Sequence, residues 1–171
     1  ASYVARRFNL PVLAFDLQQF SAILTGAVIN RTEPLSASTI WEPWLQRAKS
    51  IFDIYSPPIQ PKFTKKSVKV YRDWSAKQIN LQVTKEYGGH YFSPVQAVWI
   101  DALRKTLPKK EPDRTVALSS LVQAASQCAA APGHTAQPFQ PSRTAKKFLK
   151  GAWELDVVGR TKKVLSLLSQ Q

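Results

Sequence analysis

Apolar residues recur at helical spacing in several separate stretches of the chain. Between residues 17 and 30, Phe20, Ile23, Leu24, Ala27 and Val28 fall on one face, and this pattern predicts an amphipathic helix. The same periodicity predicts helices from a Ser93 cap to Leu107, from near Asp113 to a stop at Pro132-Gly133, from a Ser142 cap to Trp153, and over residues 157–168. The helix after Ser93 has the clearest start, because Pro94 takes its first position and Gln96 the reciprocal capping position.

A short apolar run near the start of the chain has a different pattern. Val12 to Phe15 follows Pro11 and ends at Asp16, which predicts a buried strand. Because a strand, a terminal acid and a helix in this order are typical of an α/β unit, the sequence predicts a predominantly helical α/β fragment. At the carboxyl end of such a strand Asp16 would accept hydrogen bonds from ribose hydroxyls. The alternative is that Asp16 caps the next helix.

The middle of the chain is less regular. From Glu33 to Pro61 it holds five of the twelve prolines, which limits the predicted helices there to short pieces such as Trp44 to Phe52. Over residues 62–85 basic and apolar residues alternate loosely. This pattern does not separate a hairpin from a helix around Ser75 to Gln82.

Composition adds a strong charge asymmetry. The 171 residues contain enough hydrophobic residues for one ordinary core. They carry a formal net charge of +13. The excess is concentrated in two basic blocks, residues 62–85 and 143–171, each with seven Lys and Arg. Tyr71, Trp74 and Trp153 lie among these cations, and aromatics interleaved with cations suit contact with sugar, phosphate and unstacked bases. The sequence therefore predicts nucleic-acid contact, with two merely solvated basic surfaces as the alternative.

Other residue types narrow the chemistry. The single cysteine, Cys128, lies on an apolar helical face, so it is interpreted as a buried hydrophobe, and a disulfide framework or multi-thiolate zinc site is excluded. The only histidines, His90 and His134, each lie beside a glycine, and no catalytic residue or metal ligand is predicted. No apolar run approaches the about 20 residues that span a bilayer, so we expect a soluble, cytoplasmic protein without membrane contact.

Three runs of the chain, taken together and in order, have the features of a known family. VLAFDLQQFSAILTGAVI at 12–29 contains the predicted strand, Asp16 and helix. TKEYGGHYFSPVQAVWIDALRKTL at 84–107 has a Tyr-Gly-Gly turn before a helix with an Ile-Asp pair, and VALSSLVQAASQCAAAPGHTAQPF at 116–139 has an Ala- and Ser-rich helix before a Pro-Gly-His turn. These runs resemble the central portion of adenine-specific DNA methyltransferases, which use S-adenosylmethionine.

This resemblance implies roles for particular residues. Asp16 would bind the ribose of S-adenosylmethionine, with Leu17 beside the adenine ring, in a partial Rossmann-like cofactor unit over residues 1–32. Residues 33–171 would form a helical, basic region that contacts duplex DNA. The residues near the DNA or a flipped base would be Tyr87, Gly88, Gly89, Tyr91, His134 and Gln137, and those on phosphates would be Lys65, Lys66, Lys69, Arg72, Arg143, Lys146, Lys147 and Lys150.

Two motifs of the family are absent from these residues: the glycine-rich turn before the second strand and the Asp-Pro-Pro-Tyr loop. Ser56-Pro57-Pro58-Ile59 is a poor substitute for that loop, because Ile59 takes the aromatic position. We therefore expect DNA binding without turnover from an excised piece, a truncated product or one member of a split enzyme, whose remainder would be a partner chain. The alternative function is a non-enzymatic module that binds RNA or DNA, such as a ribonucleoprotein component.

Overall fold

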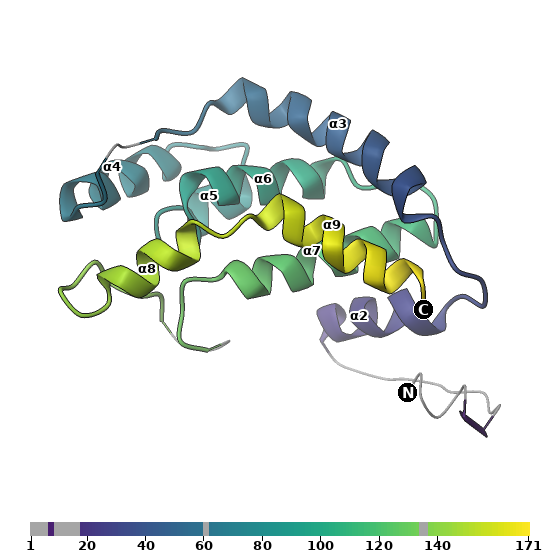
Figure 1. Cartoon of the computed structure of the whole chain (residues 1–171). Helices are drawn as coiled ribbons and strands as arrows, with labels where there is room; N and C mark the ends of the chain where they lie inside the picture. Colours follow the sequence, from purple (N-terminus) through teal and green to yellow (C-terminus); the bar gives the residue numbers. More distant parts are fainter. Residues whose placement is uncertain (1–6, 9–17, 60–61, 134–136) are drawn as a thin grey trace.

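The computed structural model describes residues 7–8, 18–59, 62–133 and 137–171, and the folded elements within them are helices (Figure 1). They are α2 (Gln19–Ile29), α3 (Ala37–Tyr55), α4 (Lys65–Ser75), α5 (Gln82–Tyr87), α6 (Pro94–Lys105), α7 (Asp113–Cys128), α8 (Lys146–Trp153) and α9 (Val157–Ser169). Among these helices none combines the length and the apolar character that crossing a membrane requires.

The predicted α/β fragment is wrong. The described residues contain no strand and no sheet, only an isolated bridge between Gly88 and Phe92, so they hold no partial Rossmann-like unit. The predicted strand at 12–15 and Asp16 lie outside the described residues. The predicted helix at 17–30 is confirmed as α2, but its buried Ala27 belongs to an all-helical core rather than covering a sheet. An amphipathic helix needs only another apolar surface, and here helices provide it.

The main hydrophobic core joins α2, α3, α6, α7 and α9. The largest side chains in it come from α3, where Trp41 is 2% exposed and Trp44 is fully buried. The indole Nε1 of Trp44 donates a hydrogen bond of 2.9 Å to the carbonyl oxygen of Leu103 on α6. Burying these two indoles stabilises the packing of α3 on α6 far more than a surface contact would.

Helix α3 is longer than the proline content predicts, because it continues through Pro43. An interior proline costs about 3 kcal/mol, since it lacks the N–H that would bond to the preceding turn. Pro43 itself is exposed, while Trp41, Trp44 and Ala48 on the same helix are buried. Each buried aromatic side chain contributes about 1.5–3 kcal/mol, so packing outweighs the local penalty.

A second, smaller core lies at the end of the molecule opposite α2 (Figure 1). It is built from Val68 and Tyr71 of α4 and from Leu149 and Trp153 of α8, with Ala130 between them. Phe63 and Phe139 cover its sides. We call this part of the molecule the α4–α8 end.

Candidate nucleic-acid interface

The α4–α8 end brings together the two basic blocks of the sequence. The ring of Trp153 meets the rings of Tyr71 and Phe63 edge-on, with centroid separations of 5.8 and 5.5 Å. Because these aromatic contacts pack α4 against α8, the lysines of both helices surround one core. Residues that are more than seventy positions apart in the chain therefore form one basic region.

Both helices begin with a pair of lysines. Lys65 and Lys66 open α4, Lys146 and Lys147 open α8, and neither helix has an acidic residue in its first turn. The amino end of a helix carries a partial positive charge, so each lysine there is unfavourable by about 0.3–1 kcal/mol. An anion bound at the same place would turn this cost into an attraction, because the helix N–H groups and the lysines then act together.

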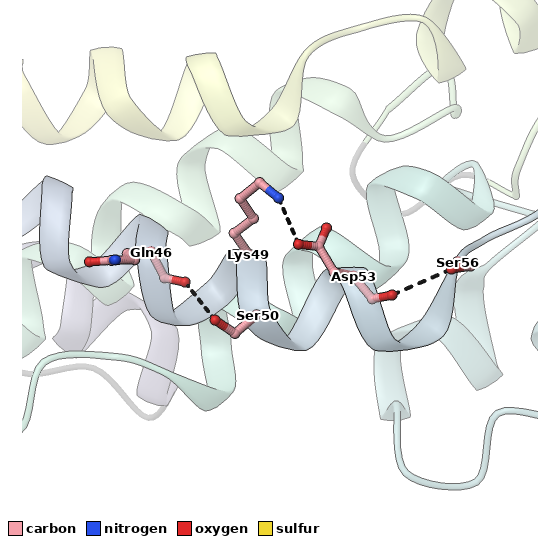
Figure 2. Close-up of polar contacts among 5 residues, drawn as sticks. All are labelled: Gln46, Lys49, Ser50, Asp53 and Ser56. Carbon is pink, nitrogen blue, oxygen red and sulfur yellow. Dashed lines mark hydrogen bonds and ion pairs between the residues drawn. The ribbon is translucent and has the colours of Figure 1, made fainter.

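The four opening lysines also have no acidic partner in the part of the chain that the structure describes. All are exposed and none forms an ion pair within the described residues. By contrast, the Nζ of Lys49 on α3 lies 2.6 Å from the Asp53 carboxylate, one turn along the same helix, and Figure 2 shows this pair. Two other predicted phosphate contacts are paired in the same way, Lys69 with Asp73 at 2.8 Å and Lys150 with Glu154 at 3.5 Å. The opening lysines are therefore more available to an external anion than the paired Lys69 and Lys150.

Arg72 has a structural role in addition to its predicted contact with DNA. Its Nε donates to the Gly89 carbonyl oxygen at 2.9 Å, and its Nη2 donates to Oε1 of Gln140 at 3.3 Å. Desolvation by burial lowers the pKa of the Arg72 guanidinium from its ordinary value. Arg72 thus connects α4 to the turn after α5 and to the segment before α8, and its contact with phosphate stays a prediction.

The predicted Gly88-Gly89 site is packed against α4. A Cβ on Gly88 would lie 2.5 Å from the Ser75 Oγ, and one on Gly89 would lie 2.8 Å from the backbone nitrogen of Arg72. Gly89 also has a backbone φ of 76°, which residues other than glycine rarely adopt. Close helix packing explains both glycines without a ligand.

The two tyrosines of this turn lie at its surface. Tyr87 is 47% exposed, Tyr91 is half-buried, and their rings meet edge-on with centroids 5.8 Å apart. The hydrogen bond between Arg72 and Gly89 places this turn beside the end of α4. The structure therefore brings Tyr87, Gly88, Gly89 and Tyr91 close to the α4–α8 end.

One surface aromatic was missed by the sequence reasoning. Phe148 shares the predicted apolar face of its helix with Leu149, yet it is 53% exposed while Leu149 is fully buried. Its ring stacks on Phe139 with centroids 5.5 Å apart, and Lys147 Nζ lies 4.9 Å from its centroid. In the sequence Phe148 directly follows a pair of lysines, and this was the signal that could have identified it as a surface aromatic.

The remaining predicted residues divide into two groups. Gln137 and Arg143 are exposed in the segment that leads into α8. Asp16, Leu17 and His134 lie outside the described residues, so S-adenosylmethionine binding stays a prediction of the resemblance. In comparisons with known proteins, no family model, no curated protein and no solved structure matches this chain.

Proposed function

We propose that the α4–α8 end binds the phosphate backbone of duplex DNA, and that the chain is the DNA-contacting portion of an adenine-specific DNA methyltransferase. The observation that carries the proposal is the packing of two lysine-initiated helices, far apart in sequence, on one small core. Four exposed lysines without ion pairs in the described residues then share one region.

A polyanion fits this region better than a small acidic ligand. Duplex DNA carries one charge per about 1.7 Å of its axis, and each phosphate that a protein neutralises releases condensed counterions. A small anion would need only one or two cations, whereas the lysines here come from two helices. Phosphate contacts of this kind position a duplex without reading its sequence.

The methyltransferase part of the proposal rests on the resemblance of residues 12–29, 84–107 and 116–139. Because the 171 residues contain no Asp-Pro-Pro-Tyr loop, we expect DNA binding by these residues without methyl transfer. Methylation assays with tritiated S-adenosylmethionine check this part directly. Efficient incorporation by the purified chain would contradict it.

The DNA-binding part is tested by fluorescence anisotropy with a short labelled duplex between about 50 and 200 mM salt, where phosphate contacts lose affinity steeply. Lys65→Glu/Lys66→Glu and Lys146→Glu/Lys147→Glu are each expected to weaken binding at least about tenfold. Each pair should also reduce the salt slope by about 2, since one phosphate contact contributes about 0.9.

The matched control is Lys109→Glu/Lys110→Glu, an adjacent and exposed lysine pair that follows α6. This variant has the same change in net charge but lies outside α4 and α8, so it should retain affinity within about twofold. Equal effects of all three variants, or a shallow salt slope, would refute the proposed surface. Competition with duplex RNA of equal length distinguishes DNA binding from the ribonucleoprotein alternative.

A further inference from the structure

A cavity of about 430 Å³ lies between α4, the start of α6 and α8. Its volume is in the range of about 300–1,000 Å³ that is usual for small-molecule sites. The segment after α3 forms one side of the cavity with Pro58 and Ile59. Because Ile59 is 82% exposed, a small molecule can enter from this side.

The walls of the cavity are mainly apolar, and three of them are aromatic. Phe63, Tyr71 and Trp153 contribute their rings, and Pro94 and Val95 of α6 also line the cavity. The rings already hold one another in place, because Trp153 meets both Tyr71 and Phe63 edge-on. A wall of this kind binds a flat apolar group without a further loss of side-chain freedom. It therefore favours a ligand with an aromatic ring.

Two residues of opposite charge, Lys150 and Glu154, line the same cavity. They lie one turn apart, and the Lys150 Nζ is 3.5 Å from the Glu154 Oε1, which is longer than the about 2.7–3.2 Å of a good hydrogen bond. The comparable pair of Lys49 and Asp53 on α3 is much closer, at 2.6 Å. The ammonium and the carboxylate at the cavity can therefore each take a hydrogen bond from a ligand.

We propose that this cavity binds a free aromatic α-amino acid. A ligand with one charge would be attracted by one member of the Lys150–Glu154 pair and repelled by the other. An α-amino acid carries both charges on one carbon atom, so its carboxylate accepts a hydrogen bond from Lys150 while its ammonium donates one to Glu154. Such charge-assisted hydrogen bonds are the strong ones. The aromatic side chain of the ligand then lies among the three rings of the cavity.

Isothermal titration calorimetry of the full chain with L-tryptophan tests the proposal. Tryptamine keeps the ring and the ammonium but lacks the carboxylate, and indole-3-propionate keeps the ring and a carboxylate but lacks the ammonium. Each is expected to bind at least about tenfold more weakly than L-tryptophan, because one charge-assisted hydrogen bond is lost. L-Alanine, which carries both charges without a ring, should not bind at the same concentrations. Equal affinities for the three indole compounds, or no binding of L-tryptophan, would overturn the proposal.

Two variants test the location of the site. The side chains of Lys150 and Glu154 are more than half exposed, so Lys150→Gln and Glu154→Gln should both fold. Each should weaken L-tryptophan at least about tenfold, whereas Lys150→Gln should not weaken tryptamine and Glu154→Gln should not weaken indole-3-propionate. The matched control is Lys49→Gln, which breaks an exposed ion pair of the same spacing that does not line the cavity, and it should keep the wild-type affinity for L-tryptophan.

The amino-acid site and the DNA surface fail separately, because these titrations contain no nucleic acid. Wild-type affinity for L-tryptophan in either cavity variant would overturn the site. Salt-sensitive DNA binding by a chain that does not bind L-tryptophan would also overturn the site and leave the phosphate surface standing. Binding of L-tryptophan by a chain that does not bind DNA would overturn only the proposed function.

Discussion

The carboxylate of Asp101 on α6 caps the start of α5 through Thr84. Its Oδ2 accepts hydrogen bonds from the Thr84 nitrogen at 2.7 Å and from the Thr84 Oγ1 at 2.9 Å. Its Oδ1 accepts another from the Val83 nitrogen at 3.1 Å. Leu81 occupies the N-cap position of α5, and its apolar side chain cannot accept these hydrogen bonds. Asp101 therefore supplies in space the cap that α5 lacks in sequence.

Replacing Asp101 is expected to destabilise the whole domain. Asp101→Ala leaves the buried Thr84 donors without an acceptor, and the side chain it removes is only 2% exposed. Losing charge-assisted bonds to buried groups should cost about 3 kcal/mol of unfolding free energy. Urea denaturation followed by far-ultraviolet circular dichroism measures the change.

The matched control is Asp73→Ala. Asp73 is exposed and pairs with Lys69 on the same helix, so its loss should cost less than about 1 kcal/mol. Equal destabilisation by the two variants would show that Asp101 does not act as a cap. The α5 helix leads into the Tyr87-Gly88-Gly89 turn, so Asp101 also fixes the position of those residues.

Helices whose signals are local in the sequence were predicted well. The Ser93 box is confirmed, with Gln96 N donating to Ser93 Oγ at 3.2 Å and Ser93 N donating to Gln96 Oε1 at 2.9 Å. The sequence pattern over residues 62–85 did not identify α4, whose capping box uses Ser67 in place of the usual Glu or Gln. The length of α3 was underestimated, since burial of its tryptophans depends on contacts with α6 that local patterns do not contain.

The same distinction applies to the candidate site. Both basic blocks could be counted in the sequence, but their proximity depends on the contact between Tyr71 and Trp153, which joins residues distant in the chain. The predicted strand at 12–15 led to the wrong fold class, because one apolar run and a helix do not require a sheet. Phe148 and Leu149 both fit the apolar pattern of their helix, and only tertiary packing shows that Leu149 is buried while Phe148 is exposed.

Replacing Gly89 or Gly151 with alanine should change the free energy of unfolding in opposite directions. At Gly89 the φ of 76° and the 2.8 Å approach to the Arg72 nitrogen leave no room for a Cβ. Gly89→Ala should therefore lower the unfolding free energy by about 2 kcal/mol or more. Gly151 is exposed within α8 and nothing lies within 4 Å of its Cβ position. Gly151→Ala should raise stability by about 0.5–1 kcal/mol. Thermal melts of both variants check the signs, and destabilisation by Gly151→Ala would contradict the packing described for α8.

Cys128 should be chemically inert in the folded protein. The side chain is fully buried, and burial raises the pKa of its thiol from 9.0 to about 11, with a smaller raising effect of Asp156 opposed by Arg160. At pH 8 a thiol reagent should label native protein only as fast as the protein unfolds, and should label urea-unfolded protein at once. Rapid labelling of the native protein would contradict this burial.

The raised pKa of Cys128 also predicts a pH dependence of stability. The unfolded thiol ionises near pH 9.0 and the folded thiol near pH 11, so between these values the unfolded state binds fewer protons. Its contribution to stability is complete below pH 9.0 and is lost as the pH rises toward 11. The difference in unfolding free energy between wild type and Cys128→Ala should change over this range and stay constant below it.

His90 is expected to remain neutral at a pH where an exposed histidine is already protonated. Burial lowers the pKa of its imidazole below the ordinary 6.5, and the positive charge of Arg72 lowers it further. The unfolded state therefore binds the additional proton first, so the contribution of His90 to stability is present above pH 6.5 and is lost as the pH falls through its folded value. An NMR titration of the imidazole protons measures this value directly.

Arg72→Gln separates the two causes of the lowered pKa. Removing the guanidinium charge should move the His90 pKa upward toward its ordinary value, while burial keeps part of the depression. Lys69→Gln removes a positive charge from the same helix at an exposed position that is paired with Asp73, and it should leave the pKa of His90 unchanged. If both variants shift the pKa equally, the general charge of α4 acts on the imidazole rather than the neighbouring Arg72.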